Sequence, residues 1–221
     1  MNLTWDHVFP QGWYPDTTPK NVEKWKIPSC LPCNNEYSKL EGELLRLLGM
    51  CVDPNVPETA GIANRALRSM NTEFGRDERD KSRRKKTAER FVKKLTVGKN
   101  IPRHAAYPGL GERWGRPNEE GIAVSVPARY FYRLAEKIIR GIYFLEKHMF
   151  IEAPYVFEFY ALTDDGAEPI GAFLDQFGSD FALEPGIKVR LASPSEDLLA
   201  CIAEITIWRQ FKMYASVMPE K

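Results

Sequence analysis

Apolar residues divide the first fifty residues into two expected strands and a helix. Residues 3–9 are rich in β-forming side chains and end at Pro10, and we expect a second short strand at residues 23–27 that ends at Pro28. After Cys30-Leu31-Pro32-Cys33, which we expect to be a tight turn, apolar residues recur at helical spacing: Tyr37, Leu40, Leu44, Leu47 and Leu48. Gly49 marks the expected end of this helix. The predicted order is strand, loop, strand, turn and helix.

The rest of the chain predicts a connecting region and a second layered unit. In residues 51–121 we expect a short helix at 61–70, a basic helix at 80–95 and a loop rich in Gly and Pro at 98–121. In residues 122–221 we expect a long helix at 129–147 and strands at 122–126, 155–162, 187–191, 202–208 and 211–217. The predicted class is α+β, with an N-terminal ββα module at 1–50, a basic helical and loop segment at 51–121 and a C-terminal domain of helix plus sheet at 122–221.

Composition points to an ordinary globular protein. The chain has 221 residues, of which 43% are hydrophobic and 28% charged, which is enough to build a buried core. No apolar run approaches the roughly 20 residues of a membrane span, and the N-terminus has neither a basic nor an apolar leader segment. Four cysteines are too few for a disulfide scaffold of this size. We therefore expect a reduced, cytoplasmic protein with no membrane partner.

Charge is distributed unevenly, although the net charge is only +1. From Arg76 to Arg103 there are twelve Lys/Arg and four Asp/Glu, so the remainder of the chain carries −7. A local positive field attracts polyanions whatever the total charge. Taken alone, the stretch is most simply a solvated helix face or a linker. Its densest cluster is Arg83, Arg84, Lys85 and Lys86.

Two segments near the N-terminus resemble a known family. Leu-Thr-Trp-Asp-His-Val-Phe-Pro, at residues 3–10, is followed by Ile-Pro-Ser-Cys-Leu-Pro-Cys-Asn-Asn-Glu-Tyr-Ser-Lys-Leu-Glu, at residues 27–41. Together they resemble the HNH endonucleases, of ββα-metal fold, over about residues 3–48. In that family an Asp/Glu–His pair ends the first strand, an Asn lies in the loop region, and a His or Asn on the helix completes the metal site. The resemblance implies a metal-dependent endonuclease that leaves 5′-phosphate and 3′-hydroxyl ends.

The residue types at the matching positions suit phosphodiester hydrolysis in DNA. His7 is the candidate general base, because a neutral imidazole titrates near pH 7. Asp6 and Asn34 offer hard oxygen ligands for Mg²⁺ or Mn²⁺, with waters and the scissile phosphate filling the other positions. Asn21 is the candidate middle Asn, which in the family holds the loop beside the general base, although its spacing to Cys30 is longer than the common pattern.

Adjacent residues of a regular strand point to opposite faces. Asp6 and His7 can therefore serve one site only if the backbone twists or turns at the strand end. The family resemblance implies that it does. Glu41 lies seven positions after Asn34 on the same helix face, and is either a second group beside the site or, as we favour, an exposed helix residue.

The cysteines depart from the family pattern. Many HNH proteins carry a second Cys-x-x-Cys before the first strand, and the two pairs bind a structural zinc. Here Met1 lies only five residues before Asp6, so no upstream pair is expected. Cys30 and Cys33 supply two of the four ligands that a structural Zn²⁺ requires. Either other ligands complete a zinc site, or the two cysteines are reduced and packing holds the turn; we favour the second.

Partners follow from the same observations. Beside a nuclease site, we expect Arg83, Arg84, Lys85 and Lys86 to bind the phosphate backbone of nucleic acid, with DNA favoured over RNA. Glu136, Lys137 and Arg140 on the long helix are most simply a solvated face. The aromatic residues of the last region make a core or a partner surface, and an oligomer could form through it.

Other functions stay open at this point. The main alternative is a catalytically inactive HNH-fold protein that binds nucleic acid equally well with and without metal. A third interpretation is a structural protein whose last region mediates assembly, which would neither bind nor cleave nucleic acid.

Overall fold

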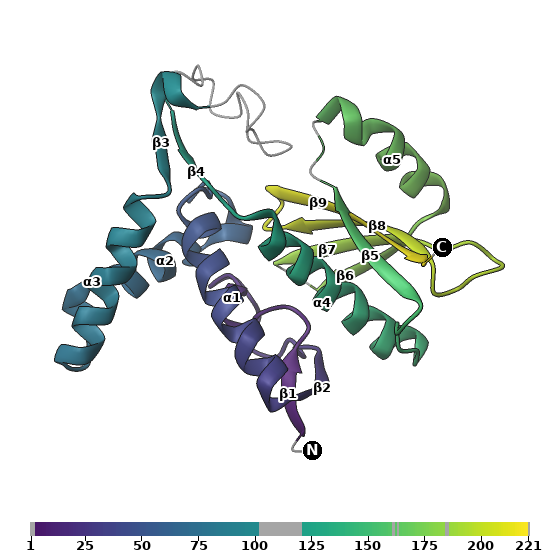
Figure 1. The fold of residues 1–221 in the computed structure, drawn as a ribbon, viewed down its shortest axis with the longest axis horizontal. Coiled ribbons are helices and arrows are strands. Elements are labelled where there is room, and N and C mark those ends of the chain that lie inside the picture. Colours follow the sequence, from purple (N-terminus) through teal and green to yellow (C-terminus); the bar gives the residue numbers. More distant parts are fainter. Residues whose placement is uncertain (1–2, 102–120, 161, 163, 184–185, 221) are drawn as a thin grey trace.

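The computed structural model describes residues 3–101, 121–160, 162, 164–183 and 186–220 (Figure 1). Its class is α+β, as predicted. The helices are α1 (Leu31–Gly49), α2 (Ile62–Met70), α3 (Glu78–Val92), α4 (Ala128–Lys147) and α5 (Asp164–Phe177). The strands are β1 (Leu3–His7), β2 (Lys26–Cys30), β3 (Leu95–Val97), β4 (Ile122–Val124), β5 (Tyr155–Tyr160), β6 (Ser179–Leu183), β7 (Ile187–Ala192), β8 (Cys201–Ile207) and β9 (Phe211–Pro219).

The N-terminal unit has the predicted order of strand, loop, strand and helix, but the tight turn expected at Cys30–Cys33 is wrong: Cys30 ends β2, and Leu31 to Cys33 form the first turn of α1. β1 pairs antiparallel with β2, from Leu3 opposite Cys30 to His7 opposite Lys26. β2 lies three residues later than expected and includes Pro28, because a two-stranded hairpin leaves an outer edge where no N–H is needed. α1 starts directly after β2, where the Cys30 Sγ caps the helix by accepting the N–H of Cys33 at 3.3 Å.

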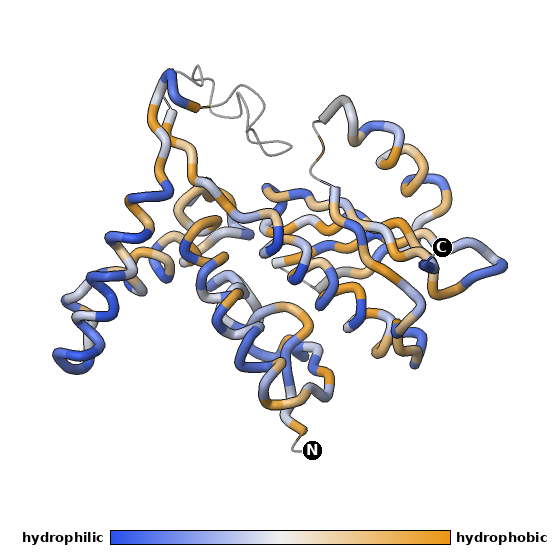
Figure 2. Tube along the Cα trace, in the orientation of Figure 1, coloured by the Kyte–Doolittle hydropathy of each residue, from blue (hydrophilic) through white to orange (hydrophobic). Residues whose placement is uncertain are grey.

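The basic helix expected at residues 80–95 is α3, which ends at Val92. Leu95 lies instead in β3, which pairs antiparallel with β4. This pairing was not predicted, because it joins two segments on either side of a long Gly- and Pro-rich stretch. Most of that stretch, residues 102–120, lies outside the described residues, and so does Arg103. Figure 2 shows α3 as a largely hydrophilic helix at the edge of the molecule.

The C-terminal region is an antiparallel sheet with strand order β5-β9-β8-β7-β6. The strands expected around β5, β7, β8 and β9 are confirmed, as is the long helix α4. One face of the sheet packs on α4 through residues such as Val189, Ile205 and Met213. The other face carries the buried Glu204, which accepts hydrogen bonds from Arg190 (3.1 Å) and Tyr214 (3.0 Å), and α5 lies over it.

One hydrophobic core joins the N-terminal unit to this sheet. Val8, Phe9 and Trp13 from the loop after β1 belong to the same buried cluster as α4 and the sheet. At the turn between β8 and β9, the buried Trp208 Nε1 donates a hydrogen bond to the carbonyl of Trp13 at 2.8 Å. The core therefore fixes β1 and α1 relative to α4, which is what positions the candidate site.

In the part of the chain that the structure describes, no helix is both long and apolar enough to cross a membrane.

Candidate functional site

Asp6 and His7 lie at the end of β1 in different surroundings. Asp6 is 7% exposed, whereas His7 is half-buried. The ladder with β2 stays regular through both residues and continues beyond them, because the N–H of Val8 donates to the carbonyl of Trp25 at 3.0 Å. Regular pairing directs the two side chains to opposite faces of the hairpin. The backbone twist that would aim both into one site is therefore not present here.

Asn34 is joined to the strand that carries this pair. It is half-buried in the first turn of α1, and its Nδ2 donates to the Thr4 hydroxyl at 3.0 Å and to the carbonyl of Trp5 at 3.3 Å. Thr4 and Asp6 share one face of β1, since they are two residues apart. The structure thus brings Asn34 to the Asp6 face of the hairpin. Its Oδ1 accepts no hydrogen bond from the described residues, so this oxygen is available as a metal ligand.

Lys137 of α4 completes the surroundings of Asp6. Its Nζ donates to Asp6 Oδ1 at 2.9 Å and also to Glu41 Oε1, and lies 5.2 Å from the centre of the Tyr37 ring. Lys137 is only 2% exposed, and the Glu41 side chain 15%. A buried ammonium thus joins two carboxylates from β1 and α1.

These contacts correct three predictions about charged helix residues. Lys137 and Glu136 are buried rather than solvated, and Glu41 is not an exposed helix residue. The reason is that α1 and α4 pack against each other. Lys137 and Glu41 therefore find partners on distant segments, whereas Glu136 pairs with Arg133 and Arg140 of its own helix. The burial of Lys137 did have a local signal in the sequence. Lys137 lies three residues after Leu134 and four before Gly141, within the buried face of α4.

The electrostatics of the site favour a neutral His7. Burial lowers the pKa of His7 from its ordinary value, the nearby Lys26 lowers it further, and Asp6 acts in the opposite direction. Burial also raises the pKa of Glu41, against the opposing effect of the Lys137 ammonium. A neutral imidazole is the form that can accept a proton near pH 7.

A divalent cation fits the donor chemistry of Asp6 and Asn34. Both offer hard oxygen atoms, which suit Mg²⁺ or Mn²⁺, and Mg²⁺ sites commonly take few protein ligands and several waters. Among the described residues, no group of three or more His, Cys, Asp or Glu converges into a richer site. Because Asp6 is already paired with Lys137, a cation there must compete with the lysine ammonium.

Among the described residues, no hydrogen bond or ion pair connects Asn21 to this site. It is exposed in the turn before β2, where the N–H of Val22 donates to the carbonyl of Pro19 at 3.2 Å. It forms no hydrogen bond with the described residues. Its role as the middle Asn of the family stays a prediction.

The four cysteines do not converge. Cys30 and Cys33 contact each other at the start of α1, where the Cys33 thiol donates to Cys30, which lowers the pKa of Cys30 and raises that of Cys33. Cys51 follows Gly49 at the far end of α1, which lies about 24 Å along the helix axis from Cys33 at 1.5 Å per residue. Burial raises the pKa of Cys51 to about 11, and Cys201 is buried in β8. Cys51 and Cys201 therefore do not supply the missing ligands of a zinc site.

The basic cluster on α3 is partly engaged within the protein. Asp80 accepts hydrogen bonds from Arg83 (2.5 Å) and Arg84 (3.0 Å), and these lower the pKa of Asp80. Arg84 also donates to the carbonyl of Arg68 and so ties α3 to α2. Lys85 and Lys86 are exposed and form no ion pair with the described residues. Of the four candidates, these two are the most available to phosphate.

Comparison of the chain with protein-family models, with curated proteins and with solved structures gives no match.

Proposed function

We propose that this protein is a metal-dependent nuclease of the HNH type that hydrolyses phosphodiester bonds in DNA. The observation that supports it best is the hydrogen bonding of Asn34 to β1, the strand that ends in Asp6-His7. Residues 27 positions apart, which match the family pattern in sequence, are thereby held on one ββα unit. The exposed cations of α3 supply the charge expected of a protein that binds a polyanion.

The roles follow from the chemistry of the residues, and they require the end of β1 to twist so that His7 joins Asp6 and Asn34 on one face. Asp6 and Asn34 would hold the cation, which would supply positive charge to stabilise the leaving oxygen. His7 accepts the proton of the attacking water, and its lowered pKa keeps it in the neutral form that can do so. The Lys137 ammonium neutralises the Asp6 carboxylate, so binding of the metal would require this ion pair to open.

The test is nicking of a supercoiled plasmid by the purified protein with Mg²⁺ or Mn²⁺, with EDTA as the metal-free control. We expect His7→Ala to lower the rate about 10²- to 10⁴-fold, which is the usual contribution of a general base. His148→Asn is the matched control, since His148 is exposed at the end of α4. Equal nicking by wild type and His7→Ala, or no metal-dependent nicking at all, would contradict the proposal.

A second candidate is an inactive protein of the same fold that binds nucleic acid without cleaving it. The observation that favours it is the buried Lys137–Asp6 pair. The Lys137 ammonium already neutralises the Asp6 carboxylate, which a metal ion would otherwise neutralise. This candidate predicts equal DNA affinity in Mg²⁺ and in EDTA, and no nicking in either.

A further inference from the structure

A positively charged groove runs between α1, the end of α3 and the start of α4. Its volume is about 980 Å³. Charged residues dominate its lining, with Lys39, Arg46, Arg90, Lys93, Lys94, Arg129 and Arg133 against Glu36 and Glu43. Only three of these cations belong to the basic stretch expected on α3, so the groove is a product of the fold.

Several of the groove's cations are not neutralised within the protein. Glu43 is bound by Arg46 (2.8 Å) and Lys94 (2.7 Å), so this carboxylate already has two cations. Arg133 lies 3.5 Å from Glu36 and 2.6 Å from Glu136. The remaining four cations are exposed and form no ion pair with the part of the chain that the structure describes: Lys39, Arg90, Lys93 and Arg129. The groove therefore keeps an uncompensated positive charge.

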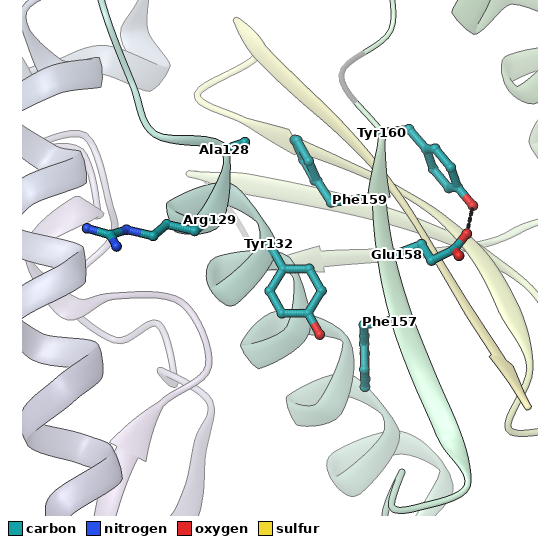
Figure 3. Close-up of a pocket in the computed structure, with 7 residues that line it drawn as sticks. All are labelled: Ala128, Arg129, Tyr132, Phe157, Glu158, Phe159 and Tyr160. Carbon is teal, nitrogen blue, oxygen red and sulfur yellow. Dashed lines mark hydrogen bonds between the residues drawn. The ribbon is translucent and has the colours of Figure 1, made fainter. Parts of the chain in front are cut away.

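An aromatic hollow of about 510 Å³ adjoins the groove. It lies between the start of α4 and the edge strand β5, and it shares Arg129 and Tyr132 with the groove. Its other lining residues include Phe157, Phe159 and Tyr160. In Figure 3, Tyr132 and Phe157 lie in the space between α4 and β5, while Arg129 points away from β5. Tyr160 is 37% exposed and Tyr132 is half-buried, whereas Phe157 is buried, so the cations lead to partly exposed ring surface.

The groove also lies near the candidate catalytic site. Arg133 of its lining lies 5.0 Å from the centre of the Tyr37 ring, and Lys137 lies 5.2 Å from the same ring. Lys137 in turn contacts Asp6. Two side chains, Tyr37 and Lys137, therefore lie between the lining of the groove and Asp6.

We propose that the groove binds the phosphate backbone of a single nucleic-acid strand, and that the aromatic hollow takes one of its bases. A row of cations beside stacking rings is the combination that holds single strands without sequence preference. The inference rests on the proposed function, since it gives that nuclease an unpaired strand or strand end as its substrate.

The test measures binding of a fluorescent DNA strand of about 16 nucleotides, the upper end of single-strand site sizes, in EDTA. If the four free cations contact phosphates, the slope of log affinity against log salt is about −3, so affinity falls about 50-fold between 50 and 200 mM salt. Lys93→Gln with Arg129→Gln should roughly halve this slope. Lys188→Gln with Lys212→Gln, the same charge change on the C-terminal sheet, should leave it unchanged.

Tyr132 tests the base site. Tyr132→Leu should weaken binding about 5-fold or more, while Tyr132→Phe, which keeps the ring, should bind as wild type. Thermal unfolding of each variant shows whether it is folded. The wild type should also bind the single strand more tightly than a duplex of the same sequence. Equal binding of the single strand and the duplex would overturn the inference. So would an unchanged salt slope in the protein that carries Lys93→Gln and Arg129→Gln.

Two further outcomes are decisive. If Lys85→Gln with Lys86→Gln abolishes binding, while Lys93→Gln with Arg129→Gln does not weaken it, the strand lies on α3 and the inference is wrong. If no nucleic acid binds but polyglutamate does, the groove serves an acidic protein partner, and the inference is again overturned. A wild-type protein that binds the single strand in EDTA but does not nick a plasmid with Mg²⁺ or Mn²⁺ would contradict only the proposed catalysis.

Discussion

The ammonium of Lys137 lies 2.9 Å from Oδ1 of Asp6, although 131 positions separate the two residues in the sequence. Both are nearly inaccessible to solvent. The same ammonium binds Glu41, so two carboxylates share one cation at the junction of β1, α1 and α4. Removing the ammonium leaves both carboxylates without a cation, and removing the carboxylates leaves a buried ammonium without an anion. Substitutions in this cluster should therefore destabilise the protein more than others in the candidate site.

Lys137→Met should destabilise the protein strongly. The substitution keeps most of the side-chain volume but leaves Asp6 and Glu41 buried without a cation, and breaking a buried ion pair costs about 3–5 kcal/mol. The free energy of unfolding from urea titration measures the effect. Lys212→Met, the same change at an exposed position of β9, should stay within about 0.5 kcal/mol of wild type. Equal stability of the two variants would mean that the pair contributes little.

Divalent cations should stabilise Lys137→Met more than wild type. If a metal binds at Asp6, removal of the competing ammonium strengthens its binding, and a ligand bound only by the folded state raises the melting temperature. At a cation concentration of about 100 times the dissociation constant, the gain is about 2.7 kcal/mol. Thermal unfolding with Mg²⁺, with Mn²⁺ and with EDTA gives the comparison.

Asp6→Asn in the Lys137→Met background is the control for this experiment, because it removes the carboxylate that the metal would bind. We expect the cation to lose its effect there. An equal rise in melting temperature in wild type, Lys137→Met and the double variant would place the cation elsewhere in the protein.

His7 should titrate below its ordinary pKa of 6.5, because burial and then Lys26 disfavour its charged form. An NMR titration, with the signal assigned by its loss in His7→Ala, measures this pKa. Lys26→Gln should raise it and Asp6→Asn should lower it further, while Lys20→Gln, an exposed charge not among the causes, should not change it.

The sign of the corresponding stability effect follows from proton linkage. Since the folded-state pKa of His7 is lowered, the unfolded chain binds the proton more readily, and stability is lost as pH falls from 6.5 through the lowered pKa. Above pH 6.5 the group makes no contribution. Metal-dependent nicking should rise over the same window as His7 becomes neutral. A nicking rate independent of pH between 5 and 7 would argue against His7 as the base.

Much of the fold was predictable because its signals are local. The helical stripe of α4 and the alternation in β7, β8 and β9 are each contained within one element, so the elements were found close to their observed bounds. α5 and β6 were not predicted. α5 contains Gly166, Pro169 and Gly171, which disfavour a helix, and its stabilising contacts, such as Arg190 of β7 with Asp175, come from the sheet beneath it.

Some residues of the candidate site could likewise be predicted from the sequence, and others could not. Asp6, His7, Cys30, Cys33 and Asn34 were recognisable because they lie on one contiguous ββα unit. Lys137 and the groove residue Arg133 could not be assigned from the sequence, since they have partners on β1 and α1, about a hundred residues away. Arg129 could not be assigned either, because the groove that it lines forms only when α1, α3 and α4 come together. The burial of a charge depends on the tertiary contact that compensates it, and periodicity does not report that contact.

The contact between α4 and the segment after β1 depends on Gly141. A Cβ at this position would lie 2.6 Å from both Cγ atoms of Val8, which is closer than side chains approach. Gly141 is one helical turn after Lys137, and Val8 is two residues after Asp6, so the same close approach sets the Lys137–Asp6 pair. Val8 is fully buried and has no free space to move into.

Gly141→Ala should therefore destabilise the protein, although alanine favours helices by about 1 kcal/mol over glycine. The overlap with Val8 costs about 1–3 kcal/mol, so we expect a net loss of about 1 kcal/mol. Val8→Ala alone should also destabilise, because it leaves a cavity. In the double variant the new methyl fills part of that cavity, so the two losses should be less than additive, by about 0.5–3 kcal/mol. Urea unfolding of the four proteins measures this coupling, and strictly additive losses would show that α4 does not rest on Val8.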